Sequence, residues 1–486
     1  MTLQLLDLPS DVIIIIINFL PFQEFSALSK TCKTLFNLVD TCGWTRYLRL
    51  NHRPSASLSL TYEKWSPTRR AGYNLFTDDS WSKLRFVARP LSRPWAGKFQ
   101  PVLALSNSRL VVAAGCTIHS YKFSMISEDT PSLQYEGTIS LNDRHNVKCD
   151  ITSLTFIQNE KRSQCLLCGL QNGSYAKVII SMDKTNKMNS RVIPFNNYHP
   201  NMDTIESLSA ESSLVLSVTS SGNASLMSTT SPDSVLSSIR LEKRSWKTFL
   251  STHGSSPFAA FGTSSDTPLS IHSVLSGSEL SSEPTAILAT KEDTQTFRPA
   301  VYGICHAPLS SPWGSSPEII ISGWFDGQVR CHDLRTSPGE LGSRSNSPST
   351  SEDNNDLVPH RPVLTLSDPW TYDPIYSVSS GGGSASHIAA GSARHSVVSF
   401  WDIRYPTKGW SVFAPGNDRS PVYDVVLESS RVFGVTDTRP FVYDFGPGIT
   451  KDTYPLLHPD NLKKRKSNPI NYYVTKYSHV NGIMDT

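Results

Sequence analysis

The apolar residues of the chain follow two different patterns, and the change lies near residue 85. The first pattern is a solid apolar run at residues 12–17, which follows Leu8-Pro9 and ends at Asn18. Proline suits the first turn of a helix, where its missing N–H is not needed, and Asp11 complements the positive end of the helix dipole. The run therefore predicts a helix that is apolar on all sides, unlike a surface helix with one apolar stripe. We expect one side to serve the local core and the other to be covered by another protein.

Two shorter helices are predicted after this run. Residues 23–28 form the second, and the apolar residues of 32–36 form the third, with Trp44 just beyond. A membrane anchor would need about 20 apolar residues, whereas the run is interrupted at Asn18 and Pro21. A signal peptide would need a basic region and a small-residue cleavage site, whereas Asp7 and Asp11 stand where the basic residues should be. An ordinary buried helix without a partner is a further alternative.

The second pattern begins beyond residue 85 and consists of β-type segments that recur along the chain. The clearest copy spans residues 319–335, where Asp326-Gly327 makes a turn and the second strand ends at His332-Asp333. Asp-Gly between two apolar segments is a strong hairpin signal. Six further copies occupy residues 110–123, 165–180, 214–228, 258–274, 387–404 and 431–445.

Alternating segments precede many of these copies, as expected for half-buried strands. They lie at residues 151–156, 205–210, 301–306, 375–380 and 422–427. The count predicts about seven units of roughly 40–70 residues each. One four-stranded unit cannot hide its edges, whereas a closed ring of units can. We expect Gly323, Gly391 and Gly434 to let strands approach closely or turn tightly.

The N-terminal pattern resembles a known helical module. A Leu-Pro start, a Phe-Leu helix end, a third segment with Cys and Leu, and a trailing Trp follow one another in order. Residues 3–50 thereby resemble the F-box, which docks the Skp adaptor of cullin-based ubiquitin ligases. The resemblance implies that the adaptor contact or its support is made by Leu6, Leu8, Pro9, Ile16, Leu20, Phe25, Leu28, Cys32, Leu35 and Trp44.

The strand endings Trp401-Asp402 and Tyr443-Asp444 resemble those of WD-repeat propeller blades. Together the two resemblances imply a multidomain fold, with a small all-α F-box followed by an all-β propeller of seven WD-repeat-type blades. We divide the chain into an F-box at residues 1–50, a helical and aromatic linker at 51–84, a propeller at 85–450, and a basic, partly disordered tail at 451–486.

Three segments between or beyond these patterns need separate interpretation. Residues 336–361 are rich in Ser, Asn and Pro, which predicts a disordered insertion; its Ser337-Pro338 and Ser347-Pro348 are either phosphorylation sites or part of a neutral loop. Residues 463–466 form a basic run that is either a nuclear-import patch or a solvated surface. The linker contains too many aromatic residues for a free tether, so we expect it to pack on both modules; they are Tyr62, Trp65, Tyr73, Phe76 and Trp81.

Composition indicates an intracellular protein. The formal net charge is +3, from 45 basic and 42 acidic residues, so no nucleic acid is expected as the main partner. No apolar window approaches the length of a membrane span, so no membrane partner is expected. The eight cysteines are scattered and read as reduced thiols, which predicts the cytoplasm or the nucleus.

Enzyme signatures are absent from the sequence, including the phosphate-binding and nucleophile-elbow motifs. Cys165 and Cys168 form a single C-x-x-C, but on a strand this spacing places them on opposite faces, which is poor for metal ligation. His306 beside Cys305 has no third ligand nearby. We therefore expect no catalysis, no metal and no cofactor.

The resemblances imply a substrate-recognition subunit of an SCF (Skp–cullin–F-box) ubiquitin ligase. The F-box would bind the Skp-type adaptor, and through it a cullin, while the propeller would hold a target protein for ubiquitination. The subunit would contribute positioning. The sequence does not predict the substrate-binding residues; pockets of Arg or Lys on the propeller would indicate a phosphorylated target.

Two alternatives remain open. Residues 401–404, and the near copy at 332–335, resemble the W-D-x-R element through which some propellers join the damage-binding-protein adaptor of another cullin. Arg335 and Arg404 would then form a second adaptor contact, although both can equally be ordinary blade residues. A scaffold whose F-box acts outside any ligase is the other alternative.

Overall fold

The computed structural model describes most of the chain, with gaps between its segments. The described segments are residues 5–127, 130–141, 149–157, 164–183, 188–195, 203–232, 234–288, 299–336, 358–416, 419–457 and 470–480. The predicted sites at Ser337, Ser347 and residues 463–466 lie outside them. Among the described residues, no helix is long and apolar enough to cross a membrane.

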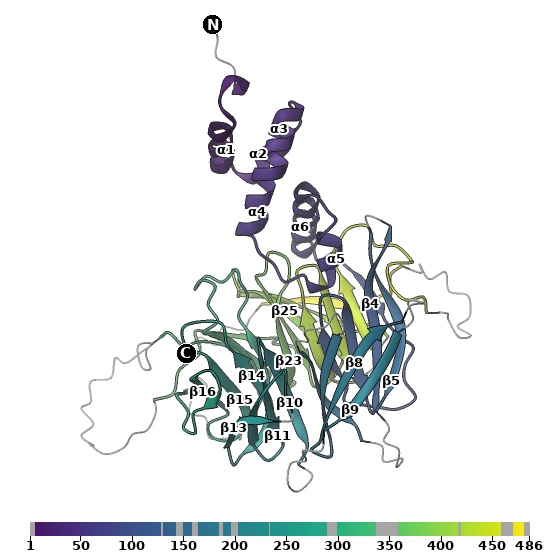
Figure 1. Ribbon diagram of the computed structural model, residues 1–486, viewed down its shortest axis with the longest axis vertical. Coiled ribbons are helices and arrows are strands. Elements are labelled where there is room, and N and C mark those ends of the chain that lie inside the picture. The colour runs from purple at the N-terminus through teal and green to yellow at the C-terminus, as the bar shows by residue number, and fades with distance from the viewer. Residues whose placement is uncertain are drawn as a thin grey trace, which may run out of the picture.

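Helices form the N-terminal part of the molecule and project from one side of a β domain (Figure 1). The first group contains the 3₁₀ turn η1 (Leu5–Asp7), α1 (Ser10–Phe19), α2 (Phe22–Ser29), α3 (Lys33–Leu38), the π-helical η2 (Val39–Trp44) and α4 (Thr45–Leu50). A second group lies at the junction with the β domain and contains the 3₁₀ turn η3 (Ala56–Leu58), α5 (Ser59–Tyr62) and α6 (Pro67–Ser82).

The strands of the described residues form seven separate antiparallel sheets, which we number as blades in chain order. Blade 1 contains β2 (Val102–Leu105), β3 (Arg109–Ala114), β4 (Thr117–Ser127) and β5 (Thr130–Ser140). Blade 2 contains β6 (Ile151–Ile157), β7 (Gln164–Leu170), β8 (Tyr175–Met182) and β9 (Met188–Pro194). Blade 3 contains β10 (Ile205–Glu211), β11 (Leu214–Thr219), β12 (Asn223–Ser228) and β13 (Val235–Arg240). Blade 4 contains β14 (Arg244–Ser251), β15 (Phe258–Ser264), β16 (Leu269–Leu275), β17 (Glu279–Leu280) and β18 (Ala286–Leu288).

The remaining three blades follow the same order. Blade 5 contains β19 (Val301–His306), β20 (Ile319–Trp324), β21 (Gln328–Asp333) and β22 (Leu364–Ser367). Blade 6 contains β23 (Ile375–Gly381), β24 (His387–Ser392), β25 (Val397–Asp402), β26 (Lys408–Phe413) and β30 (Lys476–Val480). Blade 7 contains β27 (Val422–Leu427), β28 (Arg431–Thr436), β29 (Pro440–Asp444) and β1 (Val87–Pro90).

The seven blades close into a ring. The first strand of each blade contacts the first strand of the next, and β27 of blade 7 contacts β2 of blade 1. Blade 7 is completed by β1, in which Val87 pairs with Asp444, so a strand from before blade 1 fastens the last blade. The β domain is therefore a seven-blade propeller, as predicted.

One hydrophobic cluster fills each of the seven gaps between neighbouring blades. Cys168 packs in the gap between blades 1 and 2, whereas Cys165 packs between blades 2 and 3. The prediction that these thiols lie on opposite faces of one strand is therefore confirmed. Burial raises the pKa of both thiols, which keeps them protonated at neutral pH.

The predicted hairpins coincide with the second and third strands of the blades. The copy at residues 319–335 is β20 and β21, joined at Gly327, whose φ of 80° is readily adopted only by glycine. A Cβ on Gly323 would lie 2.6 Å from a methyl group of Ile375, the first residue of the next blade. Close approach between neighbouring blades thus requires glycine here, as predicted.

The tail returns to the propeller, which the sequence did not predict. Strand β30 pairs with β26 as a fifth strand of blade 6, with Lys476 opposite Val412. Just before it, the backbone N–H of Tyr472 donates to the carbonyl of Ala88 in blade 7. The tail therefore bridges the outer edges of the last two blades.

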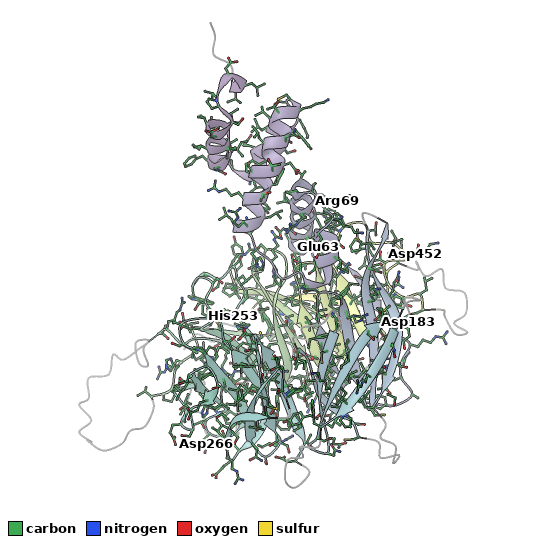
Figure 2. The ribbon with its side chains drawn as sticks, viewed as in Figure 1. Glu63, Arg69, Asp183, His253, Asp266 and Asp452 are labelled. Carbon is green, nitrogen blue, oxygen red and sulfur yellow. The ribbon has the colours of Figure 1, made fainter. Side chains whose placement is uncertain are left out.

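The propeller has two faces, which the turns of blade 4 identify. His253, in the turn after the first strand, lies on the side nearer the helices, whereas Asp266, in the turn between the second and third strands, lies on the opposite side (Figure 2). We call these the near face and the far face. Because every blade has the same strand order, the first strands all begin at the far face.

Candidate functional site

Helix α1 begins and ends at prolines that the sequence places on either side of the apolar run. Pro9 is the N-cap of α1, and its carbonyl accepts from the backbone N–H of Val12 at 3.0 Å. Leu20 ends the helix in an extended conformation, and Pro21 caps α2. The sharp turn folds α2 back onto the same small core as α1.

The two sides of α1 have different environments. Ile13 and Ile17 are buried, and Ile17 has no exposed surface. They pack in a core with Phe25, Leu35, Val39, Trp44 and Ala71. Phe25 meets the Trp44 ring edge-on with centroids 5.0 Å apart. This core is small, so it leaves the opposite side of α1 uncovered.

The uncovered side carries four apolar residues at helical spacing, which we call the α1 stripe: Val12, Ile15, Ile16 and Phe19. The spacing i, i+3, i+4 and i+7 places them on one face of the helix. Phe19 is 86% exposed and Ile15 is 54% exposed. Leu5 and Leu6 of η1 and Phe36 of α3 are further exposed apolar residues of this module. A continuous apolar face of this kind indicates a protein-binding surface.

The ten residues predicted for adaptor contact or support fall into three environments. Phe25, Leu35 and Trp44 are buried in the core. The half-buried residues pack against that core and are Leu8, Leu20, Leu28 and Cys32. Leu6, Pro9 and Ile16 are exposed. The exposed set can touch a partner directly, the half-buried set keeps some accessible surface, and the buried set can only support the surface. Their role in adaptor binding stays a prediction.

The prediction missed the most exposed residues of the surface. Ile15 and Phe19 were not among the ten, although they continue the spacing of Val12 and Ile16. The signal was present in the sequence, because Ile13 and Ile17 repeat on the opposite side of the same helix.

The helices are joined to the propeller through the linker. Arg53 is buried and donates to both carboxylate oxygens of Asp78 in α6, at 2.7 and 2.8 Å. The same guanidinium donates to the carbonyl of Gly383 in blade 6 at 3.1 Å. The guanidinium is buried whereas the Asp78 side chain is partly exposed, and such a bidentate pair with a third acceptor fixes geometry more than it adds stability.

An aromatic contact seals the same junction. Trp81, near the end of α6, stacks on Phe445 with ring centroids 3.8 Å apart and donates its indole N–H to the carbonyl of Ser429 at 2.9 Å. At the other end of α6, the hydroxyl of Thr68 donates to Asp40 of η2 at 2.6 Å. The linker thus packs on both modules, as its aromatic content led us to expect.

A buried carboxyl group adds to this junction. Glu428 of blade 7 accepts a hydrogen bond from the backbone N–H of Ser57 in η3 at 3.0 Å. Burial raises the pKa of Glu428, and the hydrogen bonds from Ser57 act in the opposite direction.

The two arginines of the alternative adaptor contact are held within their own blades. Arg335 lies 2.6 Å from the carboxylate of Asp333, and Arg404 lies 2.6 Å from that of Asp402. Hydrogen bonds from Arg335 lower the pKa of Asp333. Both arginines follow the third strand of their blades and so lie toward the near face. Their role as an adaptor contact stays a prediction.

The described residues hold no group of three metal-binding side chains. They do form a cavity of about 700 Å³ on the far face, where the first strands begin. This cavity is separate from the helical surface and is treated further below.

Comparison with known families decides what the helical module is. Residues 5–47 match the family profile described as the F-box domain. This part of the chain is an F-box domain. The match covers η1 to α4, which includes the α1 stripe and the whole core around Trp44. No curated protein is significantly similar to the chain.

The chain therefore combines an F-box with a seven-blade propeller. F-box domains bind Skp-type adaptors in cullin ligases and are typical of non-catalytic adaptor subunits. The combination fits an F-box substrate receptor. The WD-repeat character of the blades stays a prediction.

Proposed function

We propose that this protein is the substrate-recognition subunit of an SCF ubiquitin ligase in the cytoplasm or the nucleus. The observation that carries the proposal is the α1 stripe, an exposed apolar face on a matched F-box domain. Such a face gains stability only when a partner removes it from water, at about 25 cal/mol per Å² of apolar surface. A Skp-type adaptor is the partner that this domain family implies.

The arrangement of the modules supports the proposal. In Figure 1 the helix α1 lies toward the end of the molecule farthest from the propeller, so the α1 stripe is separated from the blades. The linker joins the F-box to the propeller through Arg53 and Trp81, both of which are buried. A target held on the propeller would keep a defined position relative to the ligase, which is how such a subunit promotes transfer without catalysing it.

A double substitution on the stripe tests the proposal. We expect Ile15→Ala with Phe19→Ala to weaken adaptor binding by about 100-fold or more, because each truncation removes an apolar anchor worth about 1.5–3 kcal/mol. Affinity is measured by titrating the purified full-length chain with the adaptor. Thermal unfolding of the variant should match the unsubstituted protein, because both side chains are exposed.

Leu50→Ala provides the matched control, since Leu50 is 71% exposed at the end of α4 but lies outside the stripe. Its adaptor affinity should be unchanged. Full adaptor binding by the double variant would contradict the proposal. Binding of adaptor without recruitment of cullin would favour the scaffold alternative.

A further inference from the structure

The far-face cavity is lined by a β-bulge that recurs in the first strand of six blades. In blades 2 to 7 the register between the first two strands shifts near the start of the first strand, at its third residue in blade 4 and at its second residue in the other five. Such a bulge leaves one residue unpaired and turns its side chain away from the ladder. All six bulged residues line the cavity and are Thr152, Glu206, Trp246, Tyr302, Tyr376 and Tyr423. We call this cavity the mouth.

Four of these six residues are aromatic and come from consecutive blades. The ring centroids of Trp246 and Tyr302 are 5.1 Å apart, those of Tyr302 and Tyr376 are 5.3 Å apart, and those of Tyr376 and Tyr423 are 6.1 Å apart. We call this row the aromatic arc. It covers the side of the mouth formed by blades 4 to 7, and aromatic rings attract cations to their electron-rich faces.

One end of the aromatic arc already holds a guanidinium group. Arg244 lies 4.0 Å from the centroid of Trp246 and 2.6 Å from the carboxylate of Glu206. An aromatic face and a carboxylate together are the environment that favours a bound arginine. The protein itself thus supplies the basic group at the blade 4 end.

The other end of the aromatic arc also has a ring and a carboxylate. Tyr423 belongs to blade 7, and Asp437 lies in the turn between the second and third strands of that blade. Both residues line the mouth. The Asp437 side chain is 6% exposed, and its Oδ1 has no hydrogen-bond partner within the described chain. A buried carboxylate with an unmet acceptor favours a cation nearby.

The ion pair between Asp437 and Lys98 is a loose one. Lys98 Nζ lies 3.7 Å from Oδ2, which is beyond hydrogen-bond distance, and its side chain is 80% exposed. An exposed pair of this kind contributes little, so an incoming basic group can replace it. A phosphate group is not favoured, because the mouth carries more carboxylates than cations. Its lining includes the cations Lys98, Lys247 and Arg419 and the carboxylates Asp150, Glu206, Asp424 and Asp437.

We propose that the mouth binds an extended, unphosphorylated segment of a partner protein through an arginine side chain, which pairs with Asp437 and contacts the ring of Tyr423. That this partner is a ubiquitination target rests on the proposed function; the recognition of arginine does not. The neighbouring rings of the aromatic arc would cover the apolar part of the segment.

Binding of labelled peptide pools to the full-length chain tests this inference. Each pool contains degenerate decapeptides with one fixed central residue: arginine, its neutral analogue citrulline, or phosphoserine. We expect the arginine pool to bind about tenfold more tightly than either of the others, because only arginine offers a charged, bidentate donor. Fluorescence polarisation gives the affinities, and adaptor binding is measured on the same preparation.

Variants with matched controls locate the binding site. Asp437→Asn and Tyr423→Leu should each weaken binding of the arginine pool by about tenfold. Asp266→Asn on the same face and Tyr405→Leu, which is 69% exposed in the turn after the third strand of blade 6, should leave it unchanged. Lys98→Ala should strengthen binding, a result that a misfolded variant cannot give.

Two results would overturn the inference. The first is equal binding of the arginine and citrulline pools, and the second is tightest binding of the phosphoserine pool. If adaptor binding is intact in either case, the proposed function stands and only the ligand class is wrong. If the arginine pool binds but the adaptor does not, the proposed function fails while the inference holds.

Discussion

The α1 stripe and the mouth of the propeller are both exposed, but their chemistry differs. The α1 stripe consists of aliphatic residues and one phenylalanine, with no charged side chain among its members. The mouth combines rings that can accept a cation with carboxylates and lysines. A surface of the first kind binds by excluding water over a broad apolar area. A surface of the second kind selects a particular side chain through charge and ring geometry.

This difference suits two kinds of partner. A constant partner such as an adaptor needs affinity and one fixed orientation, which a preformed apolar face provides. A partner that must be distinguished from other proteins needs a polar test, because a mismatched group leaves buried charges unpaired. The two surfaces can position a target relative to the ligase only if the linker holds them in a fixed orientation.

The largest effect is expected from breaking that relation. Trp81→Ala removes a side chain that is 2% exposed and stacked on Phe445. We therefore expect the junction to lose about 3–5 kcal/mol of stability. The linker should then become susceptible to proteolysis between residues 60 and 80, while the propeller stays folded. Limited proteolysis and circular dichroism measure the two effects.

Trp370→Ala is the control for this prediction, since Trp370 is 73% exposed on the propeller. It should leave both the cleavage pattern and the stability unchanged. Equal resistance of the Trp81 variant and the unsubstituted protein would show that the modules are not coupled through α6.

A smaller effect on stability is expected from Asp203, an acidic residue on the far face. Asp203 accepts hydrogen bonds from Ser220, Ser221 and Asn223, which hold the turn of blade 3 beside the mouth. Burial opposes ionisation, but these hydrogen bonds lower the pKa of Asp203 to about 2. The ionised group therefore stabilises the fold above its ordinary pKa of about 4, and this contribution is lost as the pH falls toward 2.

Asp203→Asn should therefore lower the free energy of unfolding by about 1 kcal/mol at pH 7, after allowance for solvent exposure. The difference from the unsubstituted protein should shrink as the pH is lowered below 5, as followed by urea unfolding. Asp266→Asn should cause no comparable change. A difference that is independent of pH would show that charge on Asp203 does not matter.

The blade pattern could be predicted from the sequence because each hairpin is local. Apolar alternation and turns such as Asp326-Gly327 predict the second and third strands directly, and Gly323 indicates the close approach of the next blade. The outer strands were harder to find. Strand β1 completes blade 7 from before blade 1, and β30 joins blade 6 from the tail, so their pairing depends on ring closure.

The functional surfaces were only partly predictable for a similar reason. The family resemblance identified the F-box, but it selected core residues such as Phe25 and Trp44 alongside exposed ones such as Ile16. Phe19 was missed although its spacing was visible. The mouth could not be read at all, because a bulge shows only in the register, and an unmet oxygen on Asp437 shows only when the ring is closed.

The two proposals together assign ligase binding to one end of the molecule and target binding to the other. Comparative affinity purification with the proteasome blocked tests this assignment most directly, using the unsubstituted chain, the Ile15→Ala/Phe19→Ala variant and a Tyr376→Leu/Tyr423→Leu variant. We expect complementary losses: the first variant loses adaptor and cullin but keeps the candidate targets, and the second keeps adaptor and cullin but loses the targets. Loss of both sets by either variant, or loss of neither, would contradict it.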